Sequence, residues 1–160
     1  MSCATASIGC TIAVSTAAPA TRDAAGYGAL DFTEATSSGT GAVVGQTLTI
    51  PQFGGTSSPT TATPLATGEV CKSQGPIDWG QLALNALYVD GDAGHVILLS
   101  GLNGDDKGKD LSFEITYPNG AIRYTAGHVS GYTETPGSAG DNIMMDATIE
   151  LNYQPVNVAA

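Results

Sequence analysis

Charge is scarce in this sequence, and positive charge is the scarcest. Charged residues make up 12% of the 160 residues, and five Lys and Arg stand against 15 Asp and Glu, which gives a formal net charge of −10. Proteins that bind nucleic acid tightly neutralise phosphates with clustered Lys and Arg. The composition therefore excludes ordinary DNA binding, although an acidic surface can serve a polyanion by repelling it as it moves past.

The shortage of charge also bears on association. A surface with few charges and many small neutral residues promotes association, and exposed apolar patches usually mark contact sites. We therefore expect copies of this chain to cover much of one another's exterior.

Cysteine pairs and targeting signals are also missing. Cys3, Cys10 and Cys71 form an odd set without disulfide-framework or C-x-x-C spacing,. No Lys or Arg precedes Arg22, and no apolar run approaches 18 residues,. We expect reduced thiols, synthesis in a cytoplasm and no membrane partner.

Catalytic patterns are absent too. The sequence has no G-x-S-x-G elbow and no phosphate-cradling G-x-x-x-x-G-K, and it has only two histidines, so general bases are few,. His95 and His128 have no Cys or His at metal-ligand spacing, which favours satisfied structural histidines. One segment resembles an EF-hand calcium loop, but Lys107 stands where that loop has an acidic ligand. The matching positions are Asn103, Asp105, Lys107, Gly108 and Glu114. We expect no metal, no cofactor and no enzyme activity.

The clearest positive signal is the alternating stretch Asp141 to Tyr153. Side chains in a strand have period 2, so one set here is apolar and the other polar. The apolar set is Met145, Ala147, Ile149, Leu151 and Tyr153. The opposite set is Met144, Asp146, Thr148, Glu150 and Asn152. This pattern predicts a long strand with one face in the core and an acidic, wet outer face.

Other segments complete a mainly β prediction for a single domain over residues 1–160. The strands are expected at Ala4–Ser15, Ala29–Glu34, Gln46–Phe53, Gly80–Tyr88, Leu111–Tyr117 and Ile122–His128, the last two joined as a hairpin through Pro118–Gly120. Pro19–Gly28 is expected to be a turn-forming run, and Gly54–Thr67 a long exposed loop.

A single helix is expected between the Gly80–Tyr88 strand and the hairpin. Asp90 or Asp92 provides its N-cap, and Gly101 or Gly104 its end. The apolar run 96–99 is expected to face inward.

The order of these pieces resembles a known family. The resemblance rests on the opening SIGCTIAVSTAAPATRDAAGYGALDFTEAT, the junction LALNALYVDGDAGHVIL and the ending SFEITYPNGAIRYTAGHVSGYTETPGSAGDNIMMDATIELN. With these segments the chain resembles the major tail tube proteins of long-tailed bacteriophages over nearly its whole length. The region Gly54 to Gln74 carries little of the resemblance.

The resemblance implies a two-sheet β-sandwich or barrel with one flanking α-helix. Six copies would close into a ring with a continuous inner β-barrel, and rings would stack head to tail into a channel for DNA ejection. The implied partners are other copies of the chain, the tape-measure, tail-tip and tail-terminator proteins, and phage DNA that passes without specific binding. The implied location is the virion tail, assembled in the host cytoplasm.

Two sets of residues follow as hypotheses. The polar side chains expected to face the lumen are Asp146, Thr148, Glu150 and Asn152, together with Glu114. The residues expected to lie between rings, in the extended loop 54–74 and in the first seven residues, are Ser2, Cys3, Thr56, Ser57, Ser58, Thr60 and Thr61.

Two alternatives stay open. The richness in Thr, Ser and Gly is also typical of a secreted or surface β-sandwich, such as an adhesin or another binding module. A bacterial secretion-type tube would share the tail-tube fold.

Overall fold

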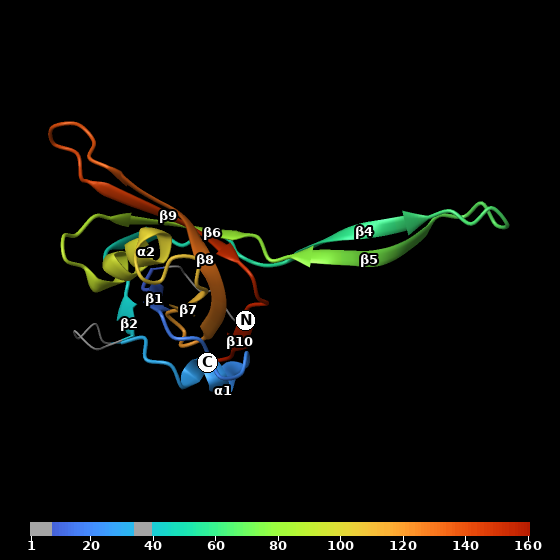
Figure 1. The fold of residues 1–160 in the computed structure, drawn as a ribbon, viewed down its shortest axis with the longest axis horizontal. Coiled ribbons are helices and arrows are strands. Elements are labelled where there is room, and N and C mark those ends of the chain that lie inside the picture. Colours follow the sequence, from blue (N-terminus) through green and yellow to red (C-terminus); the bar gives the residue numbers. More distant parts are fainter. Residues whose placement is uncertain (1–7, 34–39) are drawn as a thin grey trace, which may run out of the picture.

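The computed structural model describes residues 8–33 and 40–160. The described chain is mainly β, as expected, with far more strand than helix, and Figure 1 shows a curved sheet with one long projection. The strands are β1 (Thr11–Ser15), β2 (Gly41–Val43), β3 (Thr47–Thr49), β4 (Thr56–Ala62), β5 (Cys71–Asp78), β6 (Gln81–Leu87), β7 (Leu111–Thr116), β8 (Ile122–Thr135), β9 (Met144–Leu151) and β10 (Val156–Val158). The helices are α1 (Ala24–Gly28) and α2 (Ala93–Asn103).

Eight strands form one antiparallel sheet that curls around a core. Its order is β2-β1-β7-β8-β9-β6-β3, and β10 pairs with the start of β8. β8 is long enough to pair with β7 and β10 at one end and with β9 along the rest. The last long strand, β9, therefore lies inside the sheet, and β2 and β3 form its two edges.

The predicted alternation of β9 is confirmed. Met145, Ala147, Ile149 and Leu151 are buried, whereas Asp146 on the opposite face is exposed. β6 alternates in the same way, with Leu82, Leu84 and Ala86 buried opposite β9. The two strands thus present one apolar and one polar face.

α2 closes the main core from the concave side of the sheet. Its N-cap is Asp92, whose carboxylate accepts a hydrogen bond from the backbone N–H of His95 at 3.1 Å, and Gly104 is the C-cap. The expectation that the whole run 96–99 faces inward is wrong. Leu98 is fully buried, but Val96 and Leu99 are 58% and 37% exposed, because a helix can turn only about a third of its circumference toward the core,.

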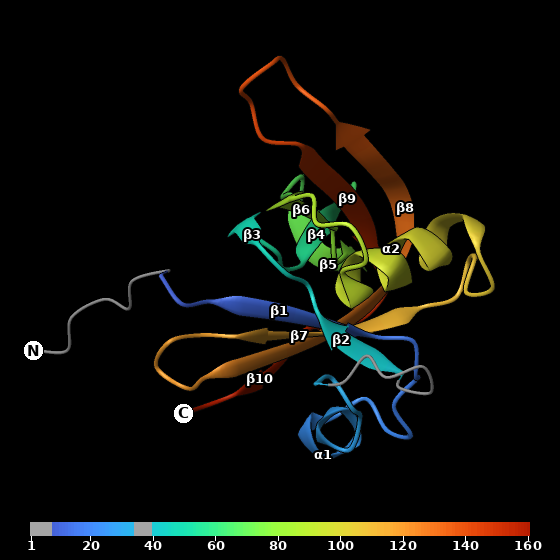
Figure 2. The same cartoon turned by 90° about the vertical axis from the view of Figure 1, so that its left-hand side faces the viewer.

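A second, smaller core lies on the other face of the sheet. α1 and the segment after it cover β1, β8 and β10 there (Figure 2). Tyr124 stacks on Tyr27 and Phe32 with ring centroids 5.4 Å and 5.9 Å apart. Two apolar clusters on opposite faces make a two-layered body from one bent sheet.

Four expectations for the first third of the chain need correction. Of the strand expected over Ala4–Ser15, the structure has β1 over Thr11–Ser15, residues 8–10 belong to no strand, and residues 4–7 lie outside the described residues. The Pro19–Gly28 run contains α1, which begins because Asp23 caps it by accepting from Gly26 N–H at 2.8 Å. Residues 29–33 form no strand, and residue 34 lies outside the described residues. The strand expected over Gln46–Phe53 is confined to β3, since Pro51 cannot donate to a ladder,.

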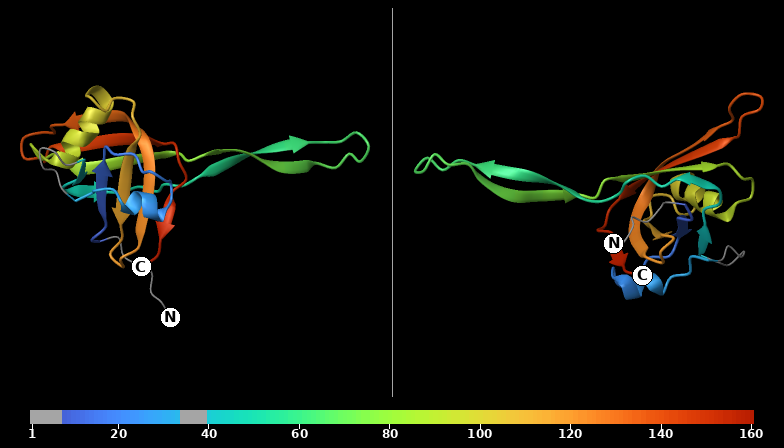
Figure 3. Two further views of the ribbon diagram at one scale, coloured as in Figure 1. Left: turned by 60° about the horizontal axis from the view of Figure 1, so that its bottom comes forward. Right: turned by 180° about the vertical axis from the view of Figure 1, so that it is seen from behind.

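The segment expected to be a long loop is a β-hairpin. β4 and β5 pair antiparallel from Thr56 opposite Asp78 to Ala62 opposite Cys71. Figures 1 and 3 show this hairpin projecting away from the body. We call residues 56–78 the arm. Its sequence is polar and contains proline, so it did not indicate strands.

The Leu111–His128 hairpin is confirmed with its turn. Tyr117 N–H donates to Ala121 O at 2.9 Å, and Gly120 has a φ of +86°, a conformation that glycine adopts without strain,. Further along β8 the register with β9 shifts between Val129 and Gly131, so that Ser130 forms a β-bulge,.

We predict that the close approach at Gly127 makes this glycine irreplaceable. A Cβ there would lie 2.1 Å from Glu150 O of β9, so Gly127→Ala must push the two central strands apart. We expect a loss of about 1–3 kcal/mol in the free energy of unfolding, measured by urea denaturation. Gly131→Ala is the matched control, because its Cβ would meet Thr148 at an ordinary 3.7 Å. Equal stability of the two variants would contradict this account.

Candidate functional surfaces

The predicted polar residues of β9 lie on one continuous surface of the sheet. Neighbouring side chains of β6 and β8 point the same way, because the register pairs Asn85 with Asp146 and His128 with Glu150. We call this surface the polar sheet face, and it consists of Asn85, His128, Ser130, Asp146, Thr148, Glu150 and Asn152.

Hydrogen bonds between strands fix the side chains of the polar sheet face. Asn85 Nδ2 donates to Asp146 Oδ1, and Ser130 Oγ donates to Glu150 Oε1 at 3.3 Å. Asn152 Nδ2 donates to Asp110 Oδ1 at 2.6 Å and lies 3.3 Å from His128 Nδ1. The acidic groups are therefore held in place without a cationic partner.

The polar sheet face carries acidic side chains and no Lys or Arg. β6, β9 and residues 127–135 of β8 contain no Lys or Arg. In the described part of the chain the ion pairs are Lys109 with Asp106 at 3.0 Å and a 3.9 Å approach of His95 to Asp92, both away from this face. A surface of this kind repels phosphate and offers water-exposed hydrogen-bonding groups.

Glu114 does not join this group. It lies on β7 opposite Tyr124 of β8, next to the smaller core, whereas β9 pairs with the other end of β8. Burial, followed by the nearby Glu114 carboxylate, raises the pKa of Tyr124. The structure thus brings four of the five hypothesised lumen residues together.

The arm forms a second candidate surface. All side chains of β4 are exposed, including the hypothesised contact residues Thr56, Ser57, Ser58, Thr60 and Thr61. Those of β5 are exposed apart from Gly75, which is half-buried. An isolated two-stranded hairpin is marginally stable in water. The other two hypothesised contact residues, Ser2 and Cys3, lie outside the described residues.

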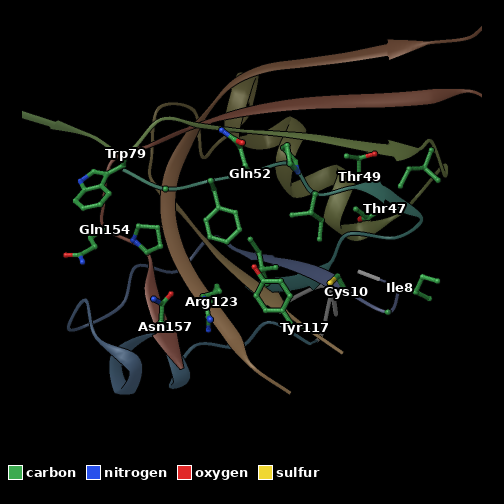
Figure 4. A pocket seen from close by; sticks show the side chains of 18 residues that line it. Ile8, Cys10, Thr47, Thr49, Gln52, Trp79, Tyr117, Arg123, Gln154 and Asn157 are labelled. Atoms are coloured by element: carbon green, nitrogen blue, oxygen red, sulfur yellow. The ribbon is translucent and has the colours of Figure 1, made fainter. Parts of the chain in front are cut away.

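A pocket opens where the two ends of the curved sheet fail to meet. Its cavity is about 860 Å³ and lies between the segment 47–54, the start of β1, and the ends of β7, β8 and β10. Figure 4 shows Tyr117 between Arg123 and Cys10 on one wall, and Trp79 at the far end near the arm. We call it the seam pocket. The sequence analysis missed it because its lining comes from distant parts of the chain.

Tyrosines gather near the N-terminal end of α2. Burial, helped by the negative charge of Glu134, raises the pKa of Tyr132 to about 12. The charge of Glu134, followed by burial, raises the pKa of Tyr88. These tyrosines are therefore neutral at physiological pH.

A pH dependence follows for Tyr132. A folded-state pKa above the unfolded value of about 10 gives stability that is present below pH 10 and is lost as the pH rises toward 12,. We predict that the urea midpoint of the wild type falls more steeply between pH 9.5 and 11.5 than that of Tyr132→Phe. Parallel pH profiles would contradict the assignment.

The structure offers little for metal chemistry. Residues 8–33 and 40–160 contain no group of three His, Cys, Asp or Glu side chains placed to hold a metal ion. His95 is buried against the core as expected, but neither ring nitrogen has a hydrogen-bond partner, so it is not a satisfied histidine. Cys10 and Cys71 are free thiols. Among the described helices, none is long and apolar enough to cross a membrane.

Comparison with solved structures shows a likeness in fold. No family model matches the chain, and no curated protein is significantly similar to it in sequence. Among solved structures, the fold is similar to that of a chain in the anti-feeding prophage (AFP) baseplate, determined by cryo-EM with six-fold symmetrisation. The match has a TM-score of 0.67 and 7% sequence identity and covers 99% of this chain and 98% of the other. The chain therefore shares the fold of a chain in the AFP baseplate.

Proposed function

We propose that this protein is the structural subunit of a bacteriophage tail tube. Six copies form a ring, rings stack head to tail, and the channel conducts DNA into the host. The observation that carries the proposal is the polar sheet face, an acidic wall on a fold shared with a chain of a six-fold symmetrised baseplate. The arm supports the proposal further, because a projecting two-stranded hairpin is marginally stable alone and is stabilised by packing against another subunit.

In this proposal the polar sheet face lines the channel. Asp146, Thr148, Glu150 and Asn152 face the lumen, and Glu114 borders it. Six chains of charge −10 bring −60 to each ring, part of it at the lumen, where it keeps DNA phosphates from adhering,. The protein acts without catalysis and without specific DNA contacts.

The arm reaches far enough to contact another ring. Nine residue steps from Thr56 to Leu65 span about 30 Å at the usual strand rise. A compact body of this size has a radius of gyration of about 14 Å and is about 35–40 Å across. In this proposal the arm, with Thr56, Ser57, Ser58, Thr60 and Thr61, contacts neighbouring subunits between rings. We propose the same role for Ser2 and Cys3, which lie outside the described residues.

The remaining partners follow from the same role. The tube grows on a tail-tip complex around a tape-measure protein and is closed by a terminator protein, and the finished particle is a virion tail assembled in the host cytoplasm. The two sheet edges β2 and β3 become covered when the ring closes, which removes strand edges that would otherwise aggregate,.

Electron microscopy tests this function directly. Purified protein, imaged in negative stain over a range of concentrations, should form six-membered rings or hollow filaments. A protein that stays monomeric at every concentration, alone and with a nucleating tail tip, would overturn the proposal.

A second candidate is a baseplate subunit that forms only one terminal ring, which the AFP baseplate likeness favours. The two roles differ in polymer length. Filaments many rings long support the tube, whereas isolated rings that never elongate support the baseplate role.

A further inference from the structure

The seam pocket contains one charged side chain, and this side chain has no counter-ion in the described chain. Of the residues that line the pocket, only Arg123 is charged. Its Nη1 donates to the backbone oxygens of Ile122 and Val158 at 3.0 Å and 3.2 Å, and its guanidinium lies 5.5 Å from the Tyr117 ring centre. No carboxylate of the described chain pairs with it, although acids outnumber bases threefold.

The walls around Arg123 combine polar side chains with incompletely covered apolar ones. Ile50, Phe53 and Trp79 pack against the main core but remain partly exposed. Residues 50–55 run along the pocket without belonging to any strand of the described chain. A cleft with an apolar section at Ile50, Phe53 and Trp79 and one arginine fits a ligand that has an apolar group and a carboxylate,.

The tip of the arm has this chemistry. Leu65 is fully exposed, and Val70 is 61% exposed. Glu69 is the only charged residue between Thr63 and Val70. A turn fixes the tip, because Thr67 N–H and Gly68 N–H both donate to Pro64 O, at 3.3 Å and 2.9 Å. The tip therefore presents a leucine and a carboxylate from a formed turn.

We propose that the arm tip of one copy docks in the seam pocket of the next. Leu65 enters the apolar part of the pocket beside Ile50 and Phe53, and the Glu69 carboxylate pairs with the Arg123 guanidinium. The proposal rests on the proposed stacking function and names the contact that produces it.

The placement of the two surfaces makes this contact directional. The arm tip lies far from its own body (Figure 1), and the seam pocket lies at the arm's base, where Gly54 and Trp79 line it. A tip-to-base contact joins two different surfaces, so it is heterologous, the type of contact that produces an open filament when its rotation does not close into a ring. Each step advances by about the reach of the arm, roughly 30–40 Å.

Cross-linking tests the contact, because Cys10 lines the seam pocket. In a chain that carries Cys3→Ser and Cys71→Ser, Leu65→Cys places one thiol at the tip and leaves Cys10 as its target. A short bismaleimide added to assembled protein should give a ladder of covalent dimers, trimers and longer oligomers on a denaturing gel. The control with Cys10→Ser should give at most about one tenth as much cross-linked product, because the tip thiol then has no thiol partner in the pocket,.

The outcomes separate this inference from the proposed function. Rings or filaments that form normally and give no ladder would overturn the docking site and leave the tube function standing. Absence of any assembly by the wild-type chain would overturn both. A ladder that needs both the Leu65→Cys substitution and Cys10 supports the docking site, whereas a ladder that persists with Cys10→Ser would overturn it.

Charge reversal provides an independent test. Glu69→Arg should raise the critical concentration for assembly about tenfold, since one charge pair that turns repulsive costs roughly a factor of this size. Combining it with Arg123→Glu should restore assembly toward the wild-type value. The thermal midpoint of each variant shows that the body is folded. A double variant that assembles no better than either single variant would contradict the pairing.

Discussion

A chain in which a two-residue Asn-Gly turn replaces residues 57–77 should fold like the wild type and fail to stack. Thr56 and Asp78 are opposite each other at the base of the arm, so their strands can be joined by a tight turn,. β4 and β5 pair only with each other, and their side chains are exposed or half-buried. The excision therefore removes almost no core packing.

Two measurements check this prediction. The thermal midpoint of the excised chain should lie within a few degrees of the wild type, because a two-stranded hairpin contributes little to the main core. Sedimentation and negative-stain microscopy should show single rings or monomers at concentrations where the wild type forms filaments. Filaments of ordinary length from the excised chain would contradict an assembly role for the arm.

A conservative variant controls for disturbance of the arm sequence. Thr60→Ser and Thr61→Ser together keep the hairpin and its polarity, because both side chains are exposed and retain a hydroxyl group. This variant should assemble at a critical concentration within about twofold of the wild type. A loss as complete as that of the excised chain would indicate that the threonine methyl groups, and not the reach of the arm, decide stacking.

Sequence patterns predicted the long central strands in which one face is buried, but missed the short strands β2 and β10. In β6 and β9 the buried Leu84 and Ile149 alternate with polar residues, and burial of one face fixes both the period and the register,. The Asn119-Gly120 turn indicated the β7–β8 hairpin for a similar local reason. These elements hold the central part of the sheet.

Sequence patterns failed to predict elements in which burial produces no regular alternation of polar and apolar residues. β4 has Pro59 and no buried side chain, so no period-2 signal distinguishes it from a loop,. α1 has five residues, too few for a helical period, and it begins through the side chain of Asp23. In α2 the apolar run 96–99 could not show which side faces the core.

The polar sheet face and the seam pocket also differ in how far the sequence could predict them. The polar sheet face follows from one strand, so the alternation around Asp146 and Glu150 was enough to predict it. The seam pocket joins Cys10, Phe53, Arg123 and Asn157, which are far apart in sequence and meet only because the sheet curls without closing. Such a site depends on tertiary structure, and no local pattern contains it.

Lysine at both Asp146 and Glu150 should leave tubes intact and block or strongly slow the passage of DNA. Each substitution removes one negative charge and adds one positive charge, so the chain changes from −10 to −6 and a ring of six from −60 to −36. The change is concentrated on the polar sheet face, where no native Lys or Arg lies. Twelve new lysines per ring would bind phosphates by releasing counterions, and passage should become faster again as salt rises.

Electron microscopy shows whether the variant tubes are intact. DNA release from particles built with these tubes measures how fast DNA passes. Asp146→Asn with Glu150→Gln keeps hydrogen-bonding oxygens toward Asn85 and Ser130, and it separates loss of acid from gain of base. Asp90→Lys with Asp105→Lys is matched in net charge, since both acids are exposed outside the polar sheet face, and it should release DNA normally. If the Asp146 and Glu150 lysine variant also releases DNA at the normal rate and with no dependence on salt, those carboxylates face away from the DNA. The acidic face of β9 would then lie on the outside of the tube, where six-fold repetition of its charge serves solubility alone.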